Sequence, residues 1–147
     1  MEDPAKNDMG RNFLSVLTGV LAAVAVGAVL IPVVEPLFDK SFTLYFFNGP
    51  PVGTQKDALI FELTLFSWLF IASFAGGFAC ALISTNKDII HVLISSLVSI
   101  VVVFFISGGE VVRQDYLFIS LLLLLSIPLG NLAGGWLGGI LKRKRKK

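Results

Sequence analysis

The chain has 147 residues and a formal net charge of +2; 55% of its residues are hydrophobic, only 15% are charged, and its mean hydropathy is +0.84. Soluble domains carry about 25% charged residues, and a chain this short has too much surface for its volume to bury four long apolar blocks in water. The composition therefore excludes a soluble protein and predicts one all-α domain, residues 1–147, that forms a four-helix bundle in a membrane.

The first apolar block, residues 13–34, follows a polar segment with three acidic residues. The block exceeds the apolar core of a signal peptide, which is about 7–15 residues long. We expect it to be an uncleaved first span.

The segment after it, residues 35–57, is the longest connection in the chain. It contains the aromatic run Phe42-Thr43-Leu44-Tyr45-Phe46-Phe47 and then the turn-forming group Asn48-Gly49-Pro50-Pro51. Aromatic rings are favoured at the headgroup level of a bilayer, so the segment fits an interfacial loop. The alternative is a docking lip for a partner or a cap over a cavity.

Three further apolar blocks follow, residues 58–84, 89–107 and 117–141. Each is long enough to cross a hydrocarbon core of about 30 Å as a helix, and none shows the alternation typical of a membrane β-strand. The connection between the second and third blocks is very short, so these two spans are expected to be antiparallel neighbours.

The chain ends in a cationic block directly after the last span. With this end in the cytoplasm, the cytoplasmic segments hold nine Lys and Arg residues and the outer segments three, as the positive-inside rule requires. We therefore place both termini on the cytoplasmic side of the cell membrane. The block is interpreted as a topology anchor that also contacts anionic headgroups, and contact with nucleic acid is the disfavoured alternative; it consists of Lys142, Arg143, Lys144, Arg145, Lys146 and Lys147.

Two similar segments lie 58 residues apart. Ala75-Gly76-Gly77-Phe78 is in the second span and Ala133-Gly134-Gly135-Trp136 is in the fourth. They indicate a possible parallel repeat of two helical hairpins, although small residues recur in membrane helices without any duplication. With their surroundings, residues 72–100 and 127–140, they resemble small four-span prokaryotic membrane proteins of unknown function, and this resemblance implies architecture only.

Small residues four positions apart recur in three of the spans. Such rows lie on one helix face and allow backbones to approach closely. We expect them to pack helices within the chain, and their number also suggests a homo-oligomer or a larger membrane complex. The predicted packing residues are Gly19, Ala23, Gly27, Ala72, Gly76, Gly77, Gly130, Gly134, Gly135, Gly138 and Gly139.

A few polar residues fall near the middle of the spans. Asn131 lies about 3 Å from the centre of the fourth span, at nearly the level of Ser73, Ser95 and Ser96. A carboxamide in hydrocarbon needs partners. We therefore expect an interhelical polar cluster of these four residues, which acts as structural glue or, alternatively, as a sparse substrate site.

Glu62 is the only carboxylate expected inside a span. An intramembrane acid can couple transport to an ion, but Glu62 lies about 13 Å from the centre of its span and can reach the outer interface. One His and one Cys, His91 and Cys80, do not make a metal site or a disulfide. We expect neither metal nor cofactor.

No catalytic or phosphate-binding motif is present. The sequence therefore favours a non-enzymatic membrane protein that works by helix packing, as a small accessory subunit or a homo-oligomer. The alternative is a small ion-coupled transporter or channel that uses Glu62 and the level of Asn131.

Overall fold

The computed structural model describes residues 4–38, 55–84, 88–106 and 117–145, which are almost entirely helical. The helices are α1 (Pro4–Val34), α3 (Gln55–Ile83), α4 (Asp88–Ile106) and α5 (Leu117–Arg145), and a short 3-10 helix, η1 (Glu35–Leu37), follows α1. All four α-helices contain stretches long and apolar enough to cross a membrane. The predicted all-α four-helix fold is confirmed.

The helices extend beyond the expected apolar blocks at several ends. The largest differences are at α1, which starts at Pro4 instead of Phe13, and at α5, which continues to Arg145 instead of ending at Leu141. Hydropathy locates the part of a helix that can lie in hydrocarbon, whereas backbone hydrogen bonding continues into polar sequence. Proline is well suited to the first position of a helix, which is where Pro4 stands.

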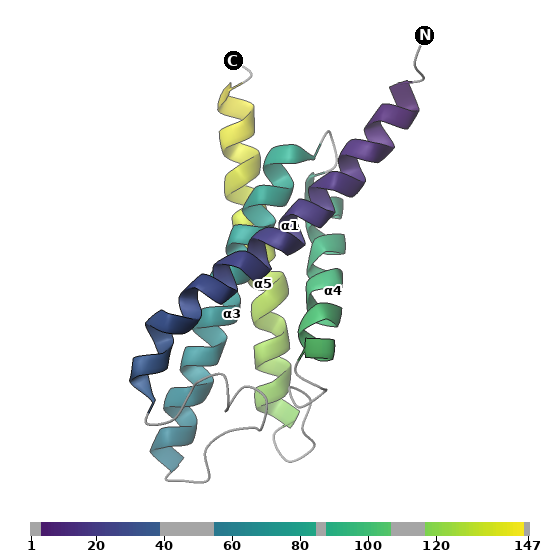
Figure 1. The fold of residues 1–147 in the computed structure, drawn as a ribbon. Coiled ribbons are helices and arrows are strands. Elements are labelled where there is room, and N and C mark those ends of the chain that lie inside the picture. The colour runs from purple at the N-terminus through teal and green to yellow at the C-terminus, as the bar shows by residue number, and fades with distance from the viewer. Residues whose placement is uncertain (1–3, 39–54, 85–87, 107–116, 146–147) are drawn as a thin grey trace.

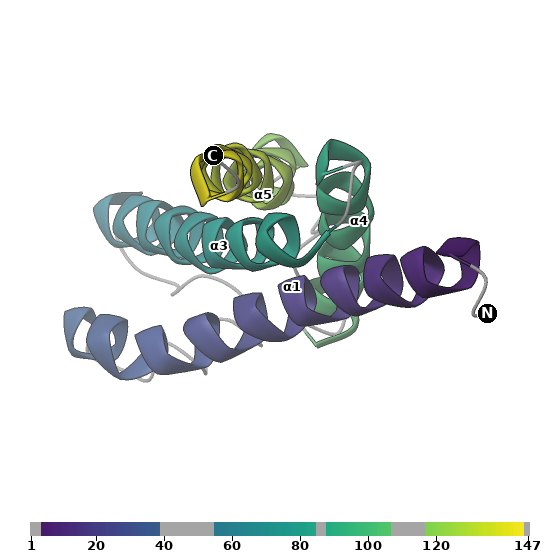
Figure 2. The ribbon, with the colours of Figure 1, turned by 90° about the horizontal axis from the view of Figure 1, so that it is seen from above.

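The helices are not arranged evenly. α3 and α5 run side by side in the same direction, α1 crosses the bundle diagonally, and α4 lies beside α5 and the first half of α1 (Figures 1 and 2). α1 starts and α5 ends at the same end of the bundle (Figure 1). The parallel course of α3 and α5 is what a repeat of two hairpins requires.

The larger apolar core lies between α3 and α5. Phe61, Leu65 and Leu69 of α3 pack with Ile127 of α5, and Phe38 joins them through an edge-on contact with Phe61 at a ring-centroid distance of 5.9 Å. Phe38 is therefore partly buried against the apolar core. The predicted loop, residues 35–57, is helical at both ends, in η1 and in the first turn of α3; residues 39–54, with the aromatic run, lie outside the described residues.

α4 is polar on its inner face and apolar on its outer face. His91, Ser95, Ser96 and Ser99 are buried against the other helices. The outward side is a continuous row of large apolar side chains, which are Ile89, Ile90, Leu93, Ile94, Leu97, Val98 and Val101. A helix in water shows the opposite arrangement, so the packing as well as the hydropathy indicates hydrocarbon surroundings.

Candidate functional site

Glycines of α5 lie in contact with the backbone of α3. A Cβ atom at Gly130 would lie 2.5 Å from the carbonyl oxygen of Phe70, and one at Gly138 would lie 2.8 Å from that of Phe78. A Cβ at Gly134 would overlap the Phe74 carbonyl. Three glycines four residues apart therefore meet three carbonyls four residues apart, and only a residue without a side chain allows this approach.

The second glycine row of α5 faces another helix. A Cβ at Gly135 would lie 2.7 Å from a methyl group of Val92 on α4, and Gly139 is also buried. On the α3 side, a Cβ at Gly77 would lie 2.6 Å from the Cα of Asn131. Glycines thus bring α5 close to α4, at Gly135, and α3 close to α5, at Gly77.

α1 crosses α3 at a second glycine contact. A Cβ at Gly19 would lie 3.0 Å from the carbonyl oxygen of Gly76, and a Cβ at Gly76 would lie 2.7 Å from that of Gly19 and 3.0 Å from the Ala23 side chain. Further along, Gly27 lies beside Ala72 and the Trp68 ring. The backbones of these helices touch where the two glycines face each other.

The small-residue rows are therefore used within the chain. The side chains and backbones that they approach all belong to neighbouring helices of the same molecule. In the sequence, the argument for a partner was that three spans carry rows of small residues, which is more than one four-helix bundle needs. The structure gives these faces internal contacts, so a proposal of a partner requires other support.

The four residues of the predicted polar cluster are all buried, but their hydrogen bonds differ from the expectation. Asn131 Nδ2 donates to Ile127 O at 3.1 Å on its own helix, and Ser96 Oγ donates to Val92 O at 3.1 Å on its own helix. The Oγ of Ser95 and the Oδ1 of Asn131 have no hydrogen-bond partner among the described residues. A membrane helix satisfies its serines and amides most easily through its own i−4 carbonyl.

The basic end of α5 has two parts. Lys142 Nζ donates to Ala81 O at 3.3 Å, to Ser84 Oγ at 3.5 Å and to Ser84 O. These carbonyls belong to the last turn of α3 and to Ser84, the residue directly after it, where a cation stabilises the negative end of the helix dipole. Lys142 is thus a cap for α3, whereas Arg143 and Lys144 are exposed; the side chain of Arg145 and residues 146–147 lie outside the described residues.

The remaining candidates do not form a site. Glu62 is half-buried in the second turn of the apolar part of α3, and His91 is buried at the start of α4. Within the ranges that the structure describes, no three His, Cys, Asp or Glu side chains lie close enough to hold a metal ion.

Two features escaped the sequence reasoning. Trp68 Nε1 donates to Gly27 O at 2.9 Å, which joins α3 to α1. Ser99 lies on a cavity between the helices, and its Oγ has no hydrogen-bond partner among the described residues. The spacing Ser95, Ser96, Ser99 could have indicated a polar helix face, but no sequence signal showed which helix it meets.

Comparisons with known proteins found no matching family model, no similar curated protein and no similar solved structure. The fold and the reversed polarity of α4 define the class: the chain is a multi-pass helical membrane protein with a four-helix bundle. The resemblance to small four-span prokaryotic proteins stays a prediction.

Proposed function

We propose that this protein is a small, non-enzymatic membrane subunit that presents a rigid helical surface to a partner. The partner is a second copy of the chain or a component of a larger complex. We place the protein in the cell membrane with both termini in the cytoplasm. The exposed cations Arg143 and Lys144 are positioned at that end to contact anionic headgroups.

The observation that supports this proposal is the contrast between α1 and the closely packed pair of α3 and α5. In the most apolar stretch of each helix, 22% of the residues are buried for α1 and 28% for α4, against 39% for α3 and 44% for α5. α3 and α5 are in glycine contact along three successive turns, whereas α1 touches α3 where it crosses, at Gly19 and Gly76, and leaves one side uncovered. Its uncovered side includes Phe13, Leu17 and Leu21, which are spaced four residues apart.

Apolar exposure alone does not distinguish lipid from protein, because lipid tails are as apolar as leucine. The test is therefore the mass of the particle extracted with its surrounding lipid, compared with the chain mass of 15.9 kDa. We expect a multiple of this mass, or co-purifying subunits. A particle that contains one chain and no other protein contradicts the proposal.

Crosslinking of two single-cysteine variants tests whether the contact with the partner is on α1. In a Cys80→Ser background, Leu21→Cys on the uncovered side of α1 should form crosslinks in native membranes. Leu97→Cys, which is equally exposed on α4, is the matched control and should not. Equal crosslinking at both positions would indicate random collision instead of an interface on α1.

The transporter alternative receives no support from the cavity among the described residues. Neither Glu62 nor Asn131 lines the cavity described below.

A further inference from the structure

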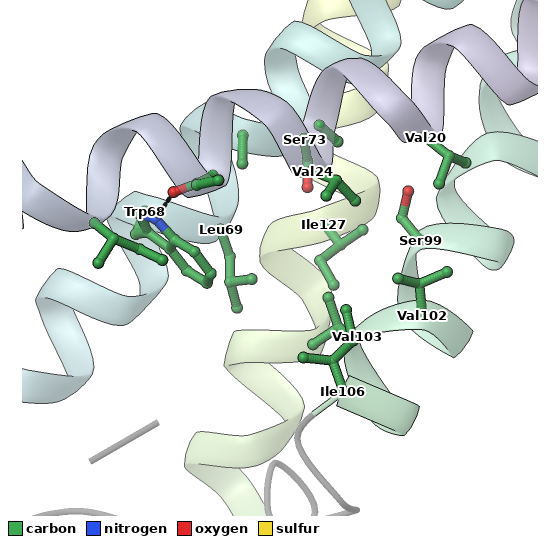
Figure 3. A pocket seen from close by; sticks show the side chains of 15 residues that line it. Val20, Val24, Trp68, Leu69, Ser73, Ser99, Val102, Val103, Ile106 and Ile127 are labelled. Carbon is green, nitrogen blue, oxygen red and sulfur yellow. Dashed lines mark hydrogen bonds between the residues drawn. The ribbon is translucent and has the colours of Figure 1, made fainter. Parts of the chain in front are cut away.

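A cavity of about 210 Å³ lies between α1, α3 and α4, with Ile127 of α5 also in its wall (Figure 3). Its lining is apolar except for the hydroxyls of Ser73 and Ser99 and the indole N–H of Trp68, which is bonded to Gly27 O. An apolar cavity of about 150 Å³ is enough to bind benzene. This cavity is therefore large enough for a small organic molecule.

The cavity arises from the diagonal course of α1. At Gly19, α1 and α4 are in contact, since a Cβ there would lie 2.8 Å from Ser95 Oγ. The two helices then separate (Figure 1), and Ala28 of α1 faces the cavity that Val102 of α4 also lines. The small side chains on this part of α1 leave the resulting space open.

The walls are held in place by packing and by one hydrogen bond. Leu69 is 3% exposed and Ile127 is 1% exposed, so both side chains are closely packed against their neighbours. The Trp68 ring is fixed by its bond to Gly27 O at 2.9 Å. The space is therefore preformed, which reduces the cost of ordering a binding site when a ligand enters.

Among the described residues, Ser99 is the lining residue whose hydroxyl is fully buried and has no hydrogen-bond partner. Its side chain is 6% exposed, and its Oγ has no hydrogen-bond partner among the described residues. Ser96, on the same helix, bonds to the carbonyl of Val92 instead. Figure 3 shows the Ser99 hydroxyl on α4 and the Ser73 hydroxyl on α3 at the same cavity. A buried hydroxyl without a partner is unfavourable, and a ligand oxygen would remove this penalty.

We propose that the cavity binds a small apolar molecule that carries one hydroxyl or carbonyl oxygen and enters from the bilayer. The hydrocarbon part packs against Leu69, Val103 and Ile127, and the oxygen exchanges a hydrogen bond with Ser99. A molecule dissolved in lipid has no water to bond, so this hydrogen bond is a net gain on binding. The ester oxygens of a phospholipid lie at the interface, which is why its acyl chain does not meet the same requirement.

The chain contains its own reporter for this site. Its two tryptophans are Trp68, in the cavity wall, and Trp136, which is 71% exposed. Trp136→Phe leaves Trp68 as the only indole. A brominated alkylphenol then serves as the probe, because bromine quenches a nearby indole, and the corresponding brominated alkylbenzene is the matched probe without the oxygen.

Titrations use the full-length Trp136→Phe protein in lipid nanodiscs. We expect saturable quenching of Trp68 by the alkylphenol and weaker binding of the alkylbenzene. Ser99→Ala should weaken alkylphenol binding about 3- to 20-fold, the range measured for hydrogen bonds between membrane helices, and should leave alkylbenzene binding unchanged. Ser96→Ala is the matched control and should change neither.

Two outcomes overturn the proposal. Quenching that does not saturate shows partition into lipid, without a site. Saturable binding that is equal for both probes and insensitive to Ser99→Ala shows an apolar cavity in which Ser99 does not bond to the ligand. Val103→Phe, which fills the space, should abolish binding of both probes; if it fails to fold, the comparison of Ser99→Ala with Ser96→Ala still decides the result.

Discussion

Gly134 of α5 lies directly on the carbonyl group of Phe74 in α3, so closely that a single added methyl group would overlap it. The contact is between two backbones, and neither can rotate away as a side chain can. This relationship makes position 134 the most sensitive test of the α3–α5 interface.

Gly134→Ala should destabilise the protein by about 1–3 kcal/mol, as is typical of an overpacked core. Thermal unfolding in detergent, followed by circular dichroism, measures the change. Gly10→Ala is the matched control, because nothing lies within 4 Å of a Cβ there and α1 is helical at that point; it should be neutral or stabilising, since alanine favours a helix by up to about 1 kcal/mol over glycine. If the two variants unfold alike, α3 and α5 do not touch at this residue.

Lys142→Met should lower stability by about 1 kcal/mol, because it removes a cation from the carbonyl end of α3. Lys144→Met changes the net charge equally, but Lys144 is exposed, so the substitution should have almost no effect. The same unfolding assay compares them. Equal losses would mean that Lys142 acts only as one of several tail charges.

Trp68→Phe should cost about 0.6–1.7 kcal/mol, the range for a hydrogen bond between membrane helices, since the bond from Nε1 to Gly27 O is lost. Trp136→Phe removes an indole of the same size from the exposed side of α5 and should leave stability unchanged. A stable Trp68→Phe protein would show that α1 is held to α3 by the glycine contact alone.

The orientation can be tested with an impermeant maleimide on intact cells. In a Cys80→Ser background, a cysteine at Gly53 should be labelled from outside, and one at Lys144 only after the cells are permeabilised. The reason is the excess of Lys and Arg in the segments assigned to the cytoplasm. The reverse labelling pattern would invert the assignment of both termini.

Glu62→Gln distinguishes the hypothesis of a non-enzymatic subunit from that of an ion-coupled transporter. A subunit needs no titratable group in its spans, whereas an ion-coupled carrier usually does, and Glu62 is the only acid in the apolar part of α3. We expect reconstituted protein to show no flux driven by a pH or sodium gradient, with or without the substitution. Flux in the wild type that Glu62→Gln abolishes would favour the transporter.

The sequence by itself determined the membrane class, the four helices and most of their bounds. These features follow from properties of short segments. The backbone groups of an apolar block in hydrocarbon must be hydrogen-bonded, and only a helix satisfies them all within one segment. The sequence also marked the glycines as packing residues. It did not show that Gly134 meets Phe74, because spacing within a helix defines a face but not the neighbour.

Only the tertiary structure decided how the faces pair. It turned the serines of α4 inward, directed Asn131 and Ser96 to carbonyls of their own helices, and brought Lys142 to the end of α3. It also placed Ser99 on a cavity that exists because α1 crosses the bundle at an angle. A crossing angle depends on side chains from several helices at once, and no single segment contains that information.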